Sequence, residues 1–396
     1  MRGKKTASDE VHTILAFSAC DTSNNDGYIG HTAMVVNCLR EQSFDVYVYG
    51  YCTGVSRISG GYFVRKPHEG YAAIEAAIRF CLRITFGAKP DAIVLTSAGA
   101  LWNPLFAILA LLRKIPIIYD CQDPAIEAIR WRYHSRPWFR LVESYLRWGM
   151  GALDAASMVA LSVSPGVDKI LRGDGWAGKI LRLYNIHNAI DNAPNEKSEA
   201  GGISLRSQFA FPGATVLIYV GGIQPSYRGL EEQIEAVRIC VSEGINVVMA
   251  VLYGSGDPTF ISDLAGDLIA NGRLKLFRNL APGNVRAFIG EGDVAVSVTL
   301  SYGLPSKMFE YVSEGVEVFC APSDEDIHSE LGSYVRGFDG TVFGVCDILR
   351  GVRGGEDERS RRRSSGKALI ESFEKKNRRV FEQVRLKILK RDREER

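Results

Sequence analysis

The chain has 396 residues, of which 46% are hydrophobic and 10% aromatic, and its formal net charge is +2. This length is enough for two domains with their own cores, and the composition is typical of a soluble globular protein. The net charge is too small to indicate nucleic-acid binding, so we expect no nucleic acid as a partner.

Cysteine spacing and hydropathy narrow the class of protein further. The eight cysteines are scattered, with no Cys-x-x-Cys pair, which argues against a zinc site and fits the reduced thiols of a cytosolic protein. The polar start of the chain predicts no secretory signal. The longest apolar run, 105–112, is far shorter than the ~20 residues that a membrane-spanning helix needs. We therefore expect a cytoplasmic protein that is soluble or a peripheral membrane protein, and not an integral one.

In the first half of the chain, short apolar runs alternate with longer helical patterns. This alternation is typical of βαβ units and parallel sheets. The predicted strands cover 13–17, 45–49, 92–95, 116–119 and 158–164. Helices are predicted over 31–40 and 104–113, and another begins at Pro165.

The same alternation restarts after 188–202, a stretch that is poor in apolar residues and rich in turn formers. We place the interdomain linker there. The strands predicted beyond it cover 215–220, 246–252, 274–277, 294–298 and 316–321. Two successive α/β sheets predict a cleft that binds ligands at the carboxyl ends of the strands.

The end of the chain is strongly charged. We predict a solvated loop for the charge run 354–363 and a helix beyond it. Apolar residues recur there at mostly helical spacing: Leu369, Phe373, Val380, Phe381, Val384 and Ile388. The predicted domains are therefore 1–190, 203–365 and a C-terminal helix with a basic tail, 366–396.

The stretch 300–315 carries the clearest local chemistry. Turn formers lead to Pro305, which suits a helix start, and Gly315 can end the helix with a positive φ. Lys307 and Glu310 are three residues apart, so their charges lie close together on the helix. The first turn has unpaired N–H groups and a partial positive charge, which together favour an anion. A plain surface Lys–Glu pair is the alternative.

This stretch resembles the donor-binding signature of retaining family 4 glycosyltransferases. It is similar to the subset that reads Pro-Ser-Lys-x-x-Glu-Tyr, here 305–311, followed by a glycine and an apolar strand. Two earlier stretches are also similar to the family. Val220-Gly221-Gly222-Ile223 with Arg228-Gly229 resembles its glycine turn and basic pair, and 251–256 resembles its strand that ends in Gly-x-Gly.

The resemblance implies the GT-B fold, with two Rossmann-like domains facing a cleft and a final helix that crosses back over both. It also implies a site for a nucleotide diphosphate sugar. Lys307 and Arg228 would neutralise the diphosphate, and Glu310 would accept hydrogen bonds from the ribose. Ser306 lies at the helix start, and the remaining donor-site residues are glycines: Gly222, Gly254 and Gly256. Simple turn geometry is the alternative for these glycines.

On the first domain, the resemblance places Gly30, His31 and Asp123 on the acceptor side of the cleft. Gly30 and His31 belong to a loop, 27–31, that we expect between the first strand and a helix. Asp123 is similar to the polar residue that contacts the transferred sugar or the acceptor. Helix capping is the alternative for both His31 and Asp123.

We thus predict a retaining hexosyltransferase that acts on a glycan or lipid-linked glycan in cell-surface polysaccharide synthesis. The resemblance implies a metal-independent enzyme without a cofactor, because the family neutralises the diphosphate without a metal ion held by an Asp-x-Asp motif. Lys307, Arg228 and Asp123 are then its expected catalytic residues.

Tyr302 and Gly222 replace a glutamate and an arginine that are usual in the family. These replacements favour an inactive sugar-nucleotide-binding homologue as an alternative. A GT-B sugar-nucleotide epimerase is a separate alternative, which would need cleft carboxylates placed for elimination. The absence of Gly-x-Gly-x-x-Gly after a strand argues against a nicotinamide oxidoreductase.

The stretch 131–140 is both basic and aromatic. In the helix that follows it, one face is predicted to carry Trp138, Leu141, Val142 and Tyr145. Helices at membrane interfaces have this composition. Peripheral contact with the inner face of a membrane is therefore one hypothesis, and packing of this face against the sheet is the other.

Overall fold

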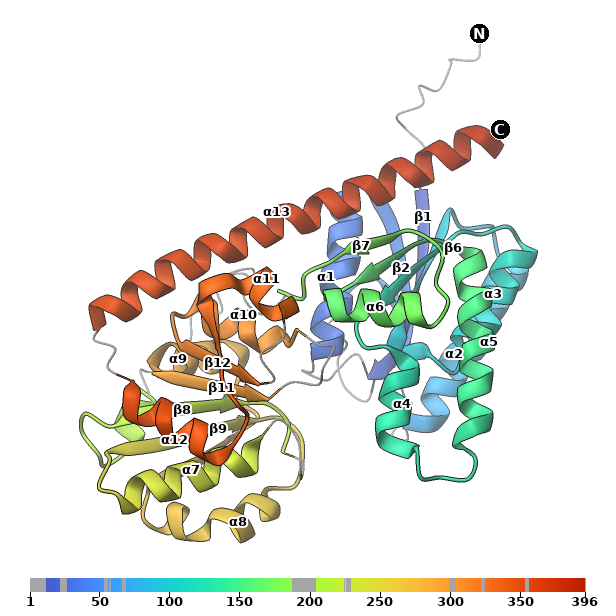
Figure 1. Ribbon diagram of the computed structural model, residues 1–396. Coiled ribbons are helices and arrows are strands. Elements are labelled where there is room, and N and C mark those ends of the chain that lie inside the picture. The colour runs from blue at the N-terminus through green and yellow to red at the C-terminus, as the bar shows by residue number, and fades with distance from the viewer. Residues whose placement is uncertain are drawn as a thin grey trace. The chain divides into compact units, whose positions relative to one another are not determined.

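The fold was determined from a computed structural model, which describes residues 12–21, 27–52, 56, 58–65, 69–186, 204–223, 225, 229–298, 304–321, 325–352 and 356–395. The chain forms two compact units, each built on one parallel sheet (Figure 1). Unit 1 comprises Met1–Tyr184 and Lys375–Arg396, and unit 2 comprises Asn185–Glu374. The predicted linker, 188–202, lies outside the described residues.

Seven strands form the sheet of unit 1, in the order β3-β2-β1-β4-β5-β6-β7. They are β1 (His12–Asp21), β2 (Phe44–Cys52), β3 (Gly61–Arg65), β4 (Ala92–Thr96), β5 (Ile117–Cys121), β6 (Ser157–Ser162) and β7 (Ile180–Arg182). The strand order reverses between β1 and β4. In open α/β sheets, ligands bind beyond the carboxyl ends of the strands at such a switch point.

Helices cover both faces of this sheet. They are α1 (Gly27–Glu41), α2 (Glu69–Phe86), η1 (Ser97–Gly99), α3 (Asn103–Leu112), α4 (Ala125–Tyr133), α5 (Phe139–Ala156) and α6 (Pro165–Gly173). One hydrophobic cluster joins α1 and the end of the last helix to alternate strand residues such as Ala16. Phe17 points to the opposite face, where its ring packs against Phe80 of α2 and Phe106 of α3.

Six strands form the sheet of unit 2, in the order β10-β9-β8-β11-β12-β13. They are β8 (Thr215–Val220), β9 (Val247–Tyr253), β10 (Leu274–Arg278), β11 (Val294–Val298), β12 (Glu317–Ala321) and β13 (Val335–Gly337). The order reverses between β8 and β11, so unit 2 repeats the plan of unit 1. Beyond the carboxyl ends of β8 and β11, its switch point predicts a second ligand site.

The helices of unit 2 are η2 (Arg206–Gln208), α7 (Leu230–Ser242), α8 (Pro258–Ala270), α9 (Pro282–Glu291), α10 (Ser306–Ser313), α11 (Glu325–Leu331), η3 (Gly332–Tyr334) and α12 (Val342–Gly351). One hydrophobic cluster joins α7, α8 and α12 to strand residues such as Leu217 and Met249. On α10, Phe309 packs edge-on against Phe373 of the last helix.

The last helix, α13 (Glu356–Glu395), contributes its first part to unit 2 and its second part to unit 1. The loop predicted for 354–363 is wrong from Glu356 onward, because that run is helical. Its arginines are not simply solvated. Arg362 donates to the carbonyl of Gly315, and Arg363 donates to those of Glu314 and Gly290. These side chains satisfy carbonyls at the ends of α9 and α10, which gives the charge run a structural role.

The predicted strands all exist, with ends that differ by a few residues. The sequence analysis did not identify the strands β3, β7 and β13, and it predicted no individual range for α2, α7, α8, α9, α11 or α12. The strands β7 and β13 have only three residues each, too few for a periodic pattern. Among the described helices, none is long and apolar enough to cross a membrane.

Candidate functional site

The turns after β8 and β9 lie at the carboxyl edge of the unit 2 sheet and are joined to each other. The N–H of Ile223 donates to the carbonyl of Ser255 at 2.9 Å, and Ile223 forms a β-bridge with Gly256. Gly256 has a φ of 103°, and a Cβ there would lie 1.9 Å from the Ile223 carbonyl oxygen. Only glycine therefore fits this position, for reasons internal to the turn.

The other two glycines of the predicted donor site are less constrained. A Cβ on Gly222 would lie 3.0 Å from the Ser255 hydroxyl, and the hydroxyl of Tyr219 donates to the Gly222 carbonyl at 2.7 Å. A Cβ on Gly254 would meet its nearest neighbour, Asn279, only at 4.0 Å. Turn geometry thus explains Gly256 and leaves Gly254 without a steric requirement.

Helix α10 starts just beyond β11 at the same edge of the sheet. Pro305 is its N-cap residue, and its side chain offers no hydrogen bond to the first turn. Gly315, with a φ of 76°, ends the helical turn as predicted. Three apolar residues on one face of the helix are buried, which fixes its direction: Met308, Tyr311 and Val312. Ser306 and Lys307 are consequently the first two residues of this first turn.

Lys307 and Glu310 form the predicted pair, with 2.7 Å between the Lys307 Nζ and the Glu310 Oε1. Only 6% of the Glu310 side chain is exposed, against 25% for Lys307. A surface pair would leave both groups in water, so this geometry disfavours the surface alternative. The buried carboxylate instead holds an accessible ammonium group beside the positive end of α10.

A second contact joins α10 to the turn that contains Gly222. The N–H of Val220, the last residue of β8, donates to the Tyr311 hydroxyl at 2.9 Å. Gly229, which caps α7, comes close to Val298 at the end of β11, where a Cβ would lie 2.4 Å from the valine methyl. The structure therefore brings the ends of β8, β9 and β11 and the start of α10 to one edge. Arg228 and Tyr302 lie outside the described residues.

In unit 1, Asp123 lies two residues beyond the carboxyl end of β5. It does not cap α4, whose N-cap is Pro124. Its carboxylate accepts a short hydrogen bond from the hydroxyl of Tyr28 on α1. Burial, and then the negative charge of Asp123, raise the pKa of Tyr28. The phenol is therefore neutral and donates at physiological pH.

His31 is not a helix cap either. We expected a loop over 27–31, but α1 begins at Gly27, so Gly30 and His31 lie within its first turns. The His31 Nε2 lies 3.0 Å from the Asp120 Oδ1, and both side chains are fully buried. The ring is thus held by a carboxylate that comes from the end of β5.

The hydroxyl of Ser97, just beyond β4, ties this region together by accepting hydrogen bonds from the N–H groups of Gln122 and Asp123. We call this group of side chains the polar cluster: Tyr28, His31, Ser97, Asp120 and Asp123. It lies beyond the carboxyl ends of β1, β4 and β5, at the switch point of unit 1. The cluster joins two residues predicted from the sequence to three that the sequence did not single out.

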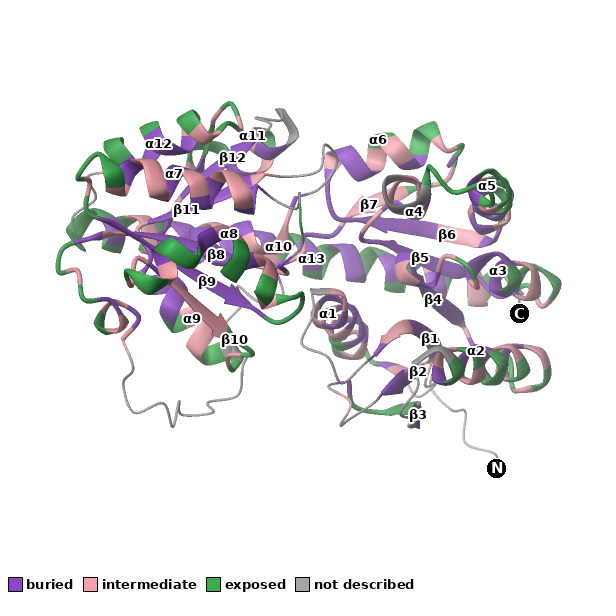
Figure 2. Ribbon diagram, turned by 90° about the horizontal axis from the view of Figure 1, so that it is seen from below, coloured by how far each residue is buried: buried purple, intermediate pink, exposed green. Residues whose placement is uncertain are grey.

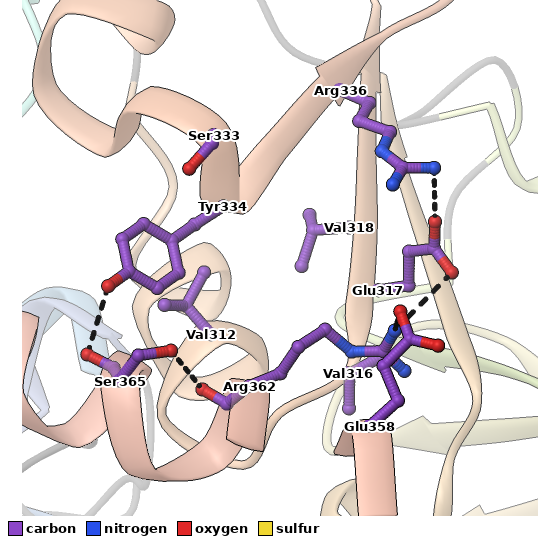
Figure 3. Close-up of a pocket in the computed structure, with 10 residues that line it drawn as sticks. All are labelled: Val312, Val316, Glu317, Val318, Ser333, Tyr334, Arg336, Glu358, Arg362 and Ser365. Atoms are coloured by element: carbon purple, nitrogen blue, oxygen red, sulfur yellow. Dashed lines mark hydrogen bonds and ion pairs between the residues drawn. The ribbon is translucent and has the colours of Figure 1, made fainter. Parts of the chain in front are cut away.

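A pocket of about 210 Å³ lies elsewhere on unit 2, between the start of β12, β13 and α13 (Figure 3). Its charged groups neutralise one another. Glu317 binds Arg336 at 2.6 Å and lies 3.8 Å from Arg362, which also binds Glu358 at 3.0 Å. None of the predicted site residues lines it. Because it adjoins the amino end of β12, it is distinct from the switch-point site.

The residues missed by sequence reasoning share one feature, which is that their partners are distant in sequence. Tyr28 and Asp123 are 95 positions apart, and His31 and Asp120 are 89 apart. Tyr28 could have been noticed as a polar side chain in the stretch 27–31, which was expected to form a loop after the first strand. Nothing local marks Tyr311 as a hydrogen-bond partner of β8, because its position on the apolar face explains it equally well.

Solved structures share this fold over almost the whole chain. HepE of Anabaena, in complex with UDP-glucose, aligns with a TM-score of 0.65 at 13% identity, over 94% of this chain and 99% of that one. A glycosyltransferase from Rickettsia africae gives 0.63 at 12% identity, over 96% and 99%. A UDP-forming α,α-trehalose-phosphate synthase from Burkholderia vietnamiensis gives 0.64 at 13% identity, over 95% and 100%.

These likenesses confirm the predicted fold class. The chain has the α/β, two-domain GT-B fold, with two Rossmann-like units and a C-terminal helix. No family model matches the sequence, and no curated protein does. At 13% sequence identity or less, structural similarity is evidence for the fold only and not for the function. Function has to be argued from the site.

Proposed function

We propose that this protein is a retaining glycosyltransferase that moves a hexose from a nucleotide diphosphate sugar to a glycan or lipid-linked glycan. One observation carries the proposal. At the switch point of unit 2, the buried Glu310 holds Lys307 at the start of α10, where the N-cap residue Pro305 makes no side-chain cap. A diphosphate needs this combination of a cation, free helix N–H groups and a positive helix end.

In the proposed reaction, the bond between the anomeric carbon and the diphosphate oxygen breaks, and its electron pair leaves with the nucleotide. A bond to an acceptor hydroxyl oxygen forms on the same face of the sugar, and the hydroxyl passes its proton to the departing diphosphate oxygen. Lys307, with Arg228, stabilises the negative charge that develops on the diphosphate. This role requires neither a metal ion nor a cofactor.

The remaining roles follow the chemistry of each side chain. Glu310 accepts hydrogen bonds from the ribose hydroxyls when Lys307 turns to the diphosphate. Ser306 donates to a phosphate oxygen, and the turns at Gly222, Gly254 and Gly256 bring backbone close to the nucleotide. In unit 1, Asp123 contacts the transferred sugar or the acceptor beside Gly30. On the same acceptor side, the fully buried His31 acts through its contact with Asp120 and positions the polar cluster.

A panel of UDP-, GDP- and dTDP-hexoses tests the proposal. We expect nucleotide release with one donor, a product of retained configuration, and an unchanged rate in EDTA. An altered sugar that is still bound to its diphosphate would identify an epimerase. Tight donor binding without turnover would identify an inactive homologue. Loss of release in EDTA would refute metal independence, and absence of binding to every donor would refute the proposal as a whole.

We further infer a role in cell-surface polysaccharide synthesis, in the cytoplasm at the inner face of the membrane. The support is the chemistry of a lipid-linked acceptor, which stays in the bilayer while its glycan is extended. Purified lipid-linked oligosaccharides and free oligosaccharides, offered as alternative acceptors, would distinguish this role. Transfer only to free sugars would contradict it.

A further inference from the structure

The outer side of α2 is apolar although no other described part of unit 1 covers it. Five large side chains follow one another along the helix with exposed fractions from 44% to 81%: Tyr71, Ile74, Ile78, Leu82 and Phe86. The opposite side of the helix is also apolar and packs on the sheet through residues such as Phe80 and Ile84. A helix that is apolar on both sides is normally buried on both sides.

The neighbouring helices extend this surface. Leu105 and Leu112 of α3 are 41% and 76% exposed, and α3 carries no charged residue. On α5, Leu141 and Trp148 are 76% and 58% exposed. The alternative that this side of α5 packs against the sheet is therefore wrong. The buried side consists of other residues: Phe139, Leu146, Gly149, Met150 and Leu153.

The three helices lie side by side, since α3 packs against both α2 and α5 (Figures 1 and 2). Each leads back to a strand of the same parallel sheet, so all three run in the same direction. We call their combined outer surface the outer helical face. In the described part of unit 2, by contrast, Phe343 is the single exposed large apolar side chain. Apolar surface this extensive marks an interaction site rather than ordinary solvent exposure.

Charges around the outer helical face select its partner. The acidic groups there are already paired, because Glu75 binds Arg79 at 2.8 Å and Glu143 accepts from two arginines. Arg136, Arg140 and Lys114 are exposed at its rim. Two copies of the chain meeting through this face would bring basic rims together, which is unfavourable. Anionic lipid headgroups would instead neutralise them.

We propose that the outer helical face docks on a lipid bilayer with anionic headgroups. Tyrosine and tryptophan at the edges of an apolar surface, with arginine and lysine beside them, match the composition of interfacial helices. The face also reaches the polar cluster. The Tyr145 hydroxyl donates to the Leu101 carbonyl at 2.8 Å, just after η1, and Ser97 of η1 binds the N–H of Asp123.

This arrangement places one end of the docked face beside the residues proposed for the acceptor side. The biological use of docking therefore rests on the proposed function, whereas docking itself does not. A lipid-linked acceptor could stay in the bilayer while its hydroxyl reaches Asp123. The sequence hypothesis named α5 alone. The structure adds α2 and α3, and with them most of the apolar surface.

Flotation of the full chain with vesicles tests the proposal. The vesicles contain phosphatidylglycerol and phosphatidylcholine in equal parts, or phosphatidylcholine alone. We expect the wild type to float with the anionic vesicles. The double variant Ile78→Glu/Leu82→Glu should lower the bound fraction at least about tenfold, because two apolar side chains can no longer enter the interface. Phe343→Glu is the matched control on unit 2 and should float like the wild type.

A second double variant shows whether loss of flotation results from the changed surface and not from misfolding of the first variant. Leu141→Glu/Trp148→Glu changes a different helix of the same face and should also prevent flotation, with thermal unfolding of both variants like that of the wild type. Failure of the wild type to float, or an equal loss in Phe343→Glu, would overturn the proposal. A dimer of the wild type, detected by sedimentation without lipid and abolished by either double variant, would also overturn the proposal. Flotation is measured without donor, so a failure of the transferase proposal would leave its result unchanged.

Discussion

The two units share one strand order around the switch point but use it differently. In the described part of unit 2, the switch point offers backbone groups and an accessible cation, because Lys307 lies at the start of α10 near glycine-containing turns. In unit 1, the equivalent edge carries side chains that bind one another, and His31 and Asp120 are both fully buried. Unit 1 also exposes the outer helical face, which has no counterpart on the described surface of unit 2.

This difference indicates that the strand order of the sheet determines where a ligand site lies, whereas the side chains at that position determine which ligand the site can bind. A site of backbone groups and a cation suits a charged, polar ligand such as a nucleotide diphosphate. A site of paired side chains suits the orientation of neutral hydroxyls. If the comparison is correct, unit 2 should respond most to changes in charge and backbone, and unit 1 to the loss of a hydrogen-bond partner.

The largest effect is expected at the unit 2 cation. Lys307→Ala should reduce nucleotide release by at least about 100-fold, because the charge on the departing diphosphate loses its stabilising partner. Glu310→Gln should have a smaller effect in the same assay, since it leaves the cation in place. Lys390→Ala removes an exposed lysine that is 3.7 Å from Glu394 and should keep the wild-type rate. If Lys307→Ala released nucleotide at the wild-type rate, the assignment of Lys307 as the cation of the unit 2 site would be wrong.

Backbone geometry in unit 2 gives the next effect. Gly256→Ala should lower the free energy of unfolding by about 3 kcal/mol, since its φ is 103° and its Cβ would meet the Ile223 carbonyl. Gly254→Ala has open space around it and should change the value by less than about 0.5 kcal/mol. Urea unfolding measures the free energy of unfolding of both variants. If both lost the same amount, the turn at Gly256 would have to rearrange to accept a Cβ atom.

In unit 1, the test removes one member of a buried pair. His31→Ala should cost about 2 kcal/mol of unfolding free energy, because the Asp120 carboxylate stays buried without its main partner. His12→Ala is the control. His12 lies 3.4 Å from Asp91 in a partly exposed pair, and its loss should cost less than about 1 kcal/mol. If urea unfolding gave the two variants the same cost, burial would not distinguish the polar cluster from the surface.

The smallest effect concerns the pH dependence of stability. Burial raises the pKa of Tyr28 above its ordinary value of 10.0, so the folded state favours the neutral phenol. This contribution is complete below pH 10 and is lost as the pH rises further, because the unfolded chain then releases the proton.

Between pH 10 and 11, the wild type should lose about 1 kcal/mol more unfolding free energy than Tyr28→Phe. Urea midpoints at pH 8, 10 and 11 measure the two slopes. Parallel slopes would show that Tyr28 ionises as easily in the folded protein as in the unfolded chain, and that the polar cluster is open to water.

The sequence by itself determined the parts that depend on local periodicity. Apolar runs of strand length predicted ten strands of the two sheets, because a parallel sheet that is covered on both faces needs them. Pro305 and Gly315 bounded α10, since each has a backbone preference of its own. The three-residue spacing of Lys307 and Glu310 predicted their pair, because helix geometry alone brings such residues together.

Only the tertiary structure decided which side chains meet across the chain and which surfaces stay uncovered. Tyr28 and Asp123, 95 positions apart, find each other because β1 and β5 end at the same edge of one sheet. The charge run at the start of α13 is helical because its arginines reach carbonyls of α9 and α10. The outer helical face could not be read from the sequence either. An apolar stripe has the same pattern whether it faces a sheet or solvent, and only packing distinguishes the two.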